Sequence, residues 1–97
     1  MTRLEAIDRI VAHKDELRGM GVASLAVFGS VARNEATDSS DVDILIEFDR
    51  PIGYFHFYDV QEALRKALKT PCVDLVMRSA VIEDLREDIL GEAVDVF

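Results

Sequence analysis

The stretch "AVFGSVARNEATDSSDVDILIEF", residues 26–48, begins as an apolar run, breaks at Gly29 and Ser30, and returns as an apolar run that contains two aspartates. Side chains alternate along a strand, so Asp41 and Asp43 share one face, with their Cα atoms about 6.5–7 Å apart. Carboxylates are rarely buried without a partner. We therefore interpret the pair as placed for a cation or a proton.

The rest of the chain surrounds this stretch with alternating helix and strand patterns. Thr2 and Glu5 form a capping-box pattern that opens a helix reaching "GMG" at 19–21. The order of elements predicts an α/β fold, a small mixed β-sheet flanked by helices, in one domain spanning residues 1–97. The expected strands are 24–28, 41–48 and 72–77, with a short terminal strand or docking tail at 93–97, and the further helices are 30–35, 53–69 and 79–90.

A third carboxylate, Asp74, lies inside the apolar run 72–77. Three carboxylates that enter from two strands make a hard, oxygen-rich site, which suits Mg²⁺ or Mn²⁺ better than zinc. The alternative is that each aspartate ends its strand or faces water. Three such positions together favour the metal site.

Gly29 and Ser30 follow the strand 24–28 directly and precede a helical pattern. A strand, a glycine turn and a helix start together direct backbone N–H groups and a hydroxyl at an anion. A Cβ atom at Gly29 would obstruct the close approach of a phosphate. The alternative is that Gly-Ser forms only an ordinary turn. The Asp-x-Asp strand that follows favours the interpretation as an anion-binding turn.

Composition narrows the classes of function. Nineteen acidic and eleven basic residues give a net charge of −8, without a local basic cluster, which disfavours direct nucleic-acid binding. No apolar run approaches the roughly 20 residues of a membrane span and the N-terminus does not resemble a signal peptide, so we expect a cytoplasmic protein. We expect the single cysteine, Cys72, to be buried, a reactive thiol being the alternative.

Other enzyme classes lack their motifs. No Gly-Lys-Ser/Thr follows the glycine turn, so a P-loop is absent. The residues around Ser30 do not complete the G-x-S-x-G motif of serine hydrolases. The segment 38–49 lacks the central glycine of an EF-hand loop.

"GSVAR" at 29–33, followed by "DVD" at 41–43, resembles the signature of the polymerase-beta-type nucleotidyltransferases, and in particular of their smallest members, the minimal nucleotidyltransferase (MNT) proteins. The resemblance covers nearly the whole chain, from the leading helix to "VDLVM" at 73–77. It implies a polymerase-beta-like nucleotidyltransferase fold. Asn34 is a departure, because many relatives have glycine after this arginine, but asparagine tolerates left-handed backbone.

The resemblance implies roles by position. Gly29 and Ser30 would hold the phosphates of ATP. Arg33 would contact phosphate, a solvated helix side chain being the alternative. Asp41 and Asp43 would bind the catalytic metal ions. Asp74 would be the third carboxylate of the metal site, and it would lower the pKa of the acceptor hydroxyl or accept its proton.

The resemblance also implies a biological partner. MNT proteins commonly act as antitoxins beside a HEPN-type RNase toxin and transfer AMP from ATP to a tyrosine of that toxin. We therefore expect a Mg²⁺-dependent protein adenylyltransferase (possible also with Mn²⁺) whose partner is encoded next to it. The alternatives are an antitoxin that neutralises its partner by stoichiometric binding, and nucleotidyl transfer to a small molecule.

One further group of residues stands out. Four aromatic side chains lie at the start of the predicted helix 53–69: Tyr54, Phe55, Phe57 and Tyr58. We interpret this cluster as part of the core and its rim, a platform for a base or a partner being the alternative.

Overall fold

The computed structural model describes residues 1–37, 39–80, 89 and 91–97. Within these ranges one mixed sheet has the strand order β3-β2-β1-β4. β1 is antiparallel to both of its neighbours, β2 and β4, whereas β2 and β3 are parallel. The strands are β1 (Val22–Phe28), β2 (Val42–Phe48), β3 (Val73–Met77) and β4 (Val94–Asp95).

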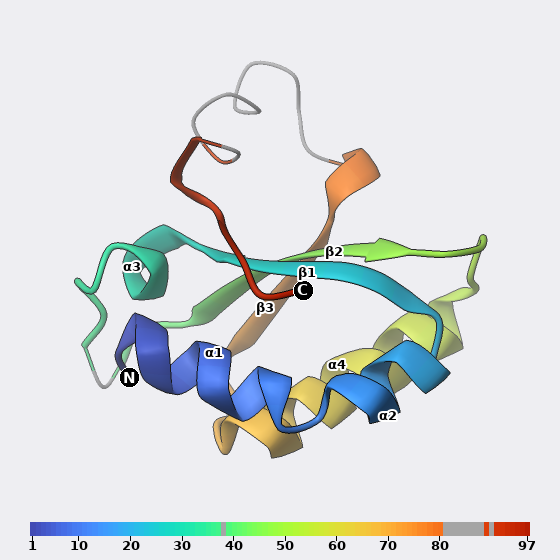
Figure 1. The fold of residues 1–97 in the computed structure, drawn as a ribbon, viewed down its shortest axis with the longest axis horizontal. Coiled ribbons are helices and arrows are strands. Elements are labelled where there is room, and N and C mark those ends of the chain that lie inside the picture. The colour runs from blue at the N-terminus through green and yellow to red at the C-terminus, as the bar shows by residue number, and fades with distance from the viewer. Residues whose placement is uncertain (38, 81–88, 90) are drawn as a thin grey trace.

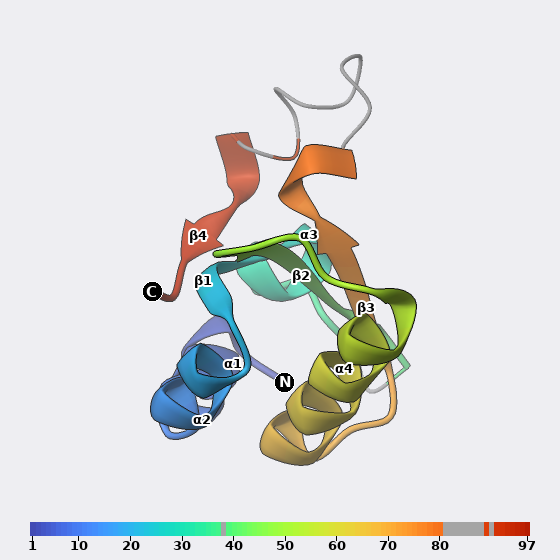
Figure 2. The same ribbon diagram turned by 90° about the vertical axis from the view of Figure 1, so that its right-hand side faces the viewer.

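Three helices cover one face of this sheet (Figures 1 and 2). A short helix, α3, lies between β1 and β2, and a 3₁₀ turn, η1, follows β3. The chain leaves the sheet after β3 and returns to it before β4, in both cases on the side opposite the three helices (Figure 2). The helices are α1 (Arg3–Val11), α2 (Lys14–Gly19), α3 (Gly29–Ala32), α4 (Tyr54–Leu68) and η1 (Arg78–Ala80).

The N-terminal helix differs from the prediction. The capping box of Thr2 and Glu5 is present, but the expected single helix is divided into α1 and α2. The division falls at His13, whose φ of −113° is not helical and whose N–H donates to the carbonyl of Ile10 instead of continuing the helix. The break lets both helices pack on the same sheet.

Alternation along the strands divides the sheet into a core face that packs against the helices and an opposite face, on which Leu45 is also buried. The core face packs against the helices through apolar side chains of β1, β2 and β3. Asp43, Leu45 and Glu47 of β2 take the opposite face. The core residues of the sheet are Val22, Leu25, Val27, Val42, Ile44, Ile46, Val73 and Leu75.

Several boundaries shift from the prediction. β2 begins at Val42, so Asp41 lies just before the strand rather than inside it. Cys72 is exposed, contrary to the expectation, because it sits in the turn before β3, where its N–H bonds the hydroxyl of Thr70. Most of the helix predicted at 79–90 lies outside the described residues, whereas the terminal strand is confirmed as β4.

Candidate active site

Three chain segments meet at one end of the sheet. β1 ends where the antiparallel β2 and its parallel neighbour β3 begin. The register pairs Phe28 with Asp43, and Asp43 with Asp74. Neighbouring strands lie about 4.8 Å apart, so the two carboxylates project side by side from the face without helices. The predicted convergence of Asp43 and Asp74 is thus produced by strand pairing.

The glycine turn lies directly against this pair. Gly29 has a φ of +70°, a conformation that L side chains rarely adopt. A Cβ atom at Gly29 would lie 2.1 Å from Oδ2 of Asp43 and 3.1 Å from its Cγ. From the sequence we expected Gly29 to allow the close approach of a phosphate. The contact with Asp43 was not predicted, because no local pattern shows which strand packs against the turn.

The carboxylates repel one another. Burial raises the pKa of Asp43, and the negative charges of Asp74 and Asp41 raise it further. The positive charge of Arg33 opposes this effect, while Glu92 adds to it. Asp41, although outside β2, therefore acts on the same electrostatic site as Asp43.

Asp41, Asp43 and Asp74 are the predicted metal ligands. Within the described ranges, no group of three or more His, Cys, Asp or Glu side chains is placed close enough together to hold a metal ion. Asp41 and Asp74 are exposed, however, and short side chains at the start of two adjacent strands can rotate toward Asp43. The donor set is purely carboxylate, and its unbalanced negative charge fits a hard divalent cation. The chemistry of the residues fits such an ion.

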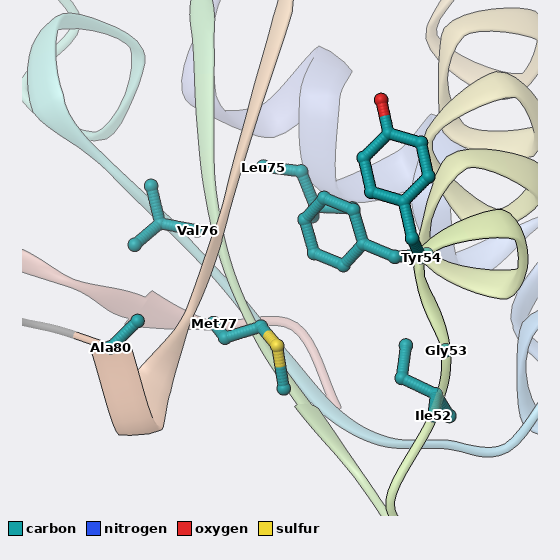
Figure 3. Close-up of a pocket in the computed structure, with 8 residues that line it drawn as sticks. Ile52, Gly53, Tyr54, Leu75, Val76, Met77 and Ala80 are labelled. Atoms are coloured by element: carbon teal, nitrogen blue, oxygen red, sulfur yellow. The ribbon is translucent and has the colours of Figure 1, made fainter.

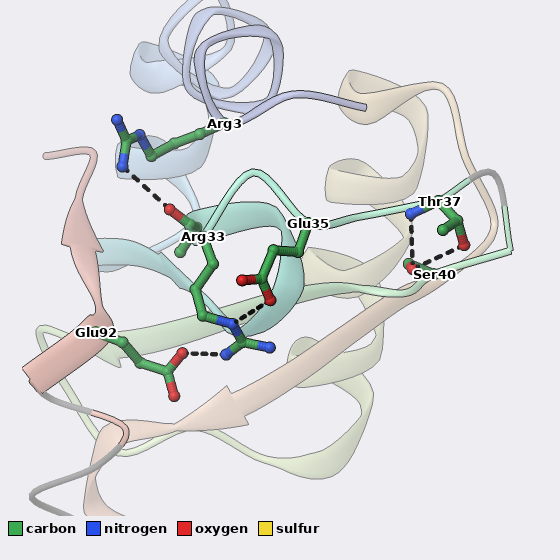
Figure 4. Close-up of polar contacts among 7 residues, drawn as sticks. Arg3, Arg33, Glu35, Thr37, Ser40 and Glu92 are labelled. Atoms are coloured by element: carbon green, nitrogen blue, oxygen red, sulfur yellow. Dashed lines mark hydrogen bonds and ion pairs between the residues drawn. The ribbon is translucent and has the colours of Figure 1, made fainter.

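Arg33 is held by two carboxylates (Figure 4). Its Nε donates to Oε2 of Glu35 at 3.0 Å, and its Nη1 forms an ion pair with Glu92. Hydrogen bonds from Arg33 to Glu35 and then to Glu92 raise the pKa of the guanidinium. The sequence placed Arg33 near the site but did not reveal Glu92, which lies far along the chain and reaches Arg33 only through the return of the C-terminal segment to the sheet.

The loop after Ser30 is fastened to the N-terminal helix. Asn34 adopts the left-handed conformation, with a φ of 58°, which asparagine tolerates better than most residues. Its Oδ1 accepts a hydrogen bond from the N–H of Arg3 at 2.9 Å. The Arg3 guanidinium donates to the carbonyl of Ala32 at 3.1 Å (Figure 4). The N–H of Glu35 donates to the carbonyl of Ser30 at 2.8 Å. These bonds hold the turn around Ser30 in place.

The family of the chain follows from comparison with known proteins. The model of the nucleotidyltransferase domain matches residues 6–96. The chain belongs to the nucleotidyltransferase family. This nucleotidyltransferase is 43% identical to the protein adenylyltransferase MntA of Thermococcus cleftensis, over 99% of this chain and 98% of the relative.

Solved structures agree with this relationship. A minimal nucleotidyltransferase structure has 32% identity and a TM-score of 0.82, covering 97% of this chain and 95% of the other. An MNT antitoxin in complex with the tri-AMPylated HEPN toxin of Shewanella oneidensis has a TM-score of 0.67, covering 99% of this chain and 72% of that one. At 17% identity, the second likeness shows the fold alone.

These findings settle several expectations. The predicted membership in the minimal nucleotidyltransferases, the mixed-sheet fold and the assignment as an enzyme of the protein adenylyltransferase kind are confirmed. A nucleotide substrate follows from the family. Among the described helices, none combines the length and the apolar character that crossing a membrane requires.

Proposed function

We propose that this nucleotidyltransferase transfers AMP from ATP to a tyrosine of a HEPN-type RNase toxin and thereby acts as its antitoxin. The observation that carries the proposal is the strand register that aligns Asp43 with Asp74 beside Gly29. The relative named MntA is a protein adenylyltransferase, and a structure of the same fold contains an AMPylated HEPN toxin. Both support a protein as the acceptor.

The nucleotide lies, in this proposal, between the glycine turn and the carboxylates. Backbone N–H groups at Gly29 and Ser30 and the Ser30 hydroxyl bind phosphate oxygens. Asp41 and Asp43, with Asp74, hold Mg²⁺, for which Mn²⁺ is the expected substitute. When bound, a divalent cation neutralises part of the negative charge of the triphosphate. Arg33 binds a phosphate after leaving Glu92.

The reaction is an in-line displacement. The tyrosine oxygen forms a bond to the α-phosphorus, while the bond from that phosphorus to the oxygen bridging to the β-phosphate breaks. Pyrophosphate leaves with the electron pair of that bond. Asp74 accepts the hydroxyl proton, since it is exposed and stands in register with Asp43 at the edge of the cluster.

The proposed partner is a protein with a basic surface. An RNase needs a basic surface to bind its substrate, and the net charge of −8 on this chain complements such a surface. The toxin is expected to be encoded next to this gene, and both proteins to act in the cytoplasm, where ATP is supplied. The nucleotidyltransferase itself does not contact nucleic acid in this proposal.

Intact-mass measurement tests the proposal. The chain is incubated with Mg²⁺, ATP and the HEPN-type RNase of the same genome, and the RNase is then weighed. We expect a mass gain of one or more AMP units that is lost with Asp43→Asn and with Asp74→Asn. Asp59→Asn, an exposed carboxylate on α4, is the matched control that keeps transfer. A tight complex that inhibits the RNase without any mass gain would show a stoichiometric binder instead.

A further inference from the structure

The outer edge of β3 offers unpaired backbone groups. The carbonyl of Cys72 accepts the N–H of Val42 at 2.8 Å, which directs the backbone groups of residue 72 toward β2. Because these directions alternate along a strand, Asp74 and Val76 also face β2. The N–H and C=O groups of Leu75 and Met77 therefore point outward, away from the sheet. β3 is the outermost strand in the described sheet.

One outward group on this edge already has a partner. Gln61 of α4 donates its side-chain amide to the carbonyl of Val73 at 3.2 Å. In the part of the chain that the structure describes, Leu75 and Met77 have no comparable backbone partner. The edge is thus closed at its first outward residue and open beyond it.

An apolar groove of about 450 Å³ runs along this open edge (Figure 3). Leu75 and Met77 form its floor. Tyr54 and Phe57, from the first turn of α4, form one wall, and Ala80 lies at the far end of the strand. Apart from the hydroxyl of Tyr54, the polar groups that line the groove belong to the backbone.

Large aromatic side chains are exposed at the rim. The exposed fractions are 78% for Tyr54, 83% for Phe55 and 48% for Tyr58. Neighbouring exposed aromatic residues mark an interaction surface more often than a solvated face. Phe57 is half-buried against the core, and Tyr54, Phe55 and Tyr58 form the exposed rim.

We propose that this groove binds an extended segment of the protein acceptor, which adds a strand to the edge of β3. This inference deepens the proposed function and rests on it. An extended backbone supplies the alternating N–H and C=O groups that Leu75 and Met77 need, whereas a helix or an apolar small molecule leaves them unpaired. Apolar side chains of the segment enter the groove.

Charge and position favour the acceptor as the occupant. The groove begins one residue along β3 from the active site, because Leu75 directly follows Asp74, while the side chains of these two residues take opposite faces of the sheet. A basic protein is attracted to this acidic chain, whose net charge is −8. The docked segment therefore carries basic residues beside its apolar ones.

The geometry places the acceptor tyrosine. A residue of the added strand that lies opposite Asp74 has its Cα about 4.5–5.5 Å away and its side chain on the same face of the sheet. That face carries both Asp43 and Asp74. A tyrosine at this position brings its hydroxyl to the carboxylates, so strand addition both binds the acceptor and orients it.

Hydrogen exchange tests the docking directly. The amide hydrogens of Leu75 and Met77 should exchange fast in the free chain and slow at least tenfold when the HEPN-type RNase is added without ATP. Asp74 and Val76, whose amides already bond β2, serve as internal controls. A complex that forms without slowing at Leu75 and Met77 overturns the proposal. So does slowing in the chain alone that accompanies a dimeric mass, because the occupant is then a second copy.

Edge variants test the role in transfer. Met77→Pro removes an outward N–H, which an edge position tolerates, and Met77→Ala is its matched control. We expect Met77→Pro to raise the KM for the protein acceptor at least tenfold while ATP binding is unchanged, and Met77→Ala to have a much smaller effect. Phe55→Ser, at a residue 83% exposed, weakens acceptor binding even if Met77→Pro does not fold.

The two proposals can fail separately. Native chain that forms a protected complex but transfers no AMP refutes the proposed reaction and leaves the groove standing. If the native chain transfers AMP and the Met77→Pro and Phe55→Ser variants transfer it equally well, only the groove proposal is refuted.

Discussion

A Cβ atom on Gly29 would lie 2.1 Å from Oδ2 of Asp43, closer than Cβ atoms approach other heavy atoms in proteins. The glycine turn and the carboxylate strand are therefore fitted to one another. The side chain of Asp43 occupies space that exists only because residue 29 lacks a side chain. One glycine thus serves both the turn and the carboxylate.

Gly29→Ala should damage both the fold and the site. The φ of +70° costs an alanine about 1–2 kcal/mol, which lowers the Tm of a domain of this size by roughly 4–16 °C. The methyl group also forces Asp43 to turn away, so AMP transfer should fall by much more than the loss of folded protein explains. Thermal melts and transfer rates below the Tm measure the two effects.

A double-mutant cycle isolates the contact. Gly29→Ala in an Asp43→Ala background should cost less stability than in the native chain, because the clash is absent and only the backbone strain remains. Gly19→Ala is the matched control, since a Cβ at Gly19 meets nothing within 4 Å. Strict additivity of the two substitutions would contradict the contact.

Asp43→Asn should stabilise the protein without ligand at neutral pH. Burial, and then Asp74 and Asp41, raise the pKa of Asp43 above its ordinary value of 3.8, so the folded state binds the proton more tightly than the unfolded state. Stability therefore falls as pH rises from 3.8 through the raised pKa, and the penalty is complete above it. The amide removes this penalty.

The pH dependence provides the check. The Tm of Asp43→Asn should exceed that of the native chain at pH 7, and the difference should shrink as pH falls toward 3.8. Asp59→Asn, which lies outside the cluster, should lack this pattern. A difference that grows on acidification would have the wrong sign and would reject the electrostatic explanation.

Mg²⁺ should restore the stability that the carboxylates cost. For a site half-saturated at about 1 mM, 10 mM Mg²⁺ adds roughly 1.4 kcal/mol, a Tm increase of roughly 6–11 °C. Calorimetric melts with Mg²⁺, against a KCl control of equal ionic strength, measure this. Equal shifts in the native chain and in Asp43→Asn and Asp74→Asn would mean that Mg²⁺ binds elsewhere.

Glu92→Gln should strengthen nucleotide binding. Glu92 pairs with Arg33, and both residues act on the electrostatics of Asp43. A phosphate has to displace this carboxylate before it can bind Arg33, so its removal should tighten ATP binding about two- to fivefold at low salt. Isothermal titration calorimetry checks this, with Arg33→Gln in the same background expected to cancel the gain. Unchanged or weaker binding would show that Glu92 does not compete.

Local sequence patterns were sufficient to predict several features of the candidate site. Gly29 and Ser30 stand after an apolar strand, and the aspartates interrupt apolar runs where carboxylates are costly. Asn34 could be expected to take left-handed backbone from its residue type alone, and its φ of 58° agrees. These features depend on neighbours in the chain, so the sequence displays them.

Other features depend on which distant segments pair. The break at His13, the exposure of Cys72 and the start of β2 after Asp41 follow from how helices and strands fit around one core. Glu92 has no sequence signal that connects it with Arg33, because their ion pair forms only when the C-terminal segment returns to the sheet.

The sequence by itself determined the classes of residue at the site and the alternation that sets them on strands, since both are properties of neighbouring positions. Only the tertiary structure decided that Asp43 faces Asp74, that its side chain fills the space left open at Gly29, and that the edge of β3 is open at Leu75 and Met77 within the described sheet. Strand order and register are set by the packing of the whole core, and no short stretch of sequence contains that information.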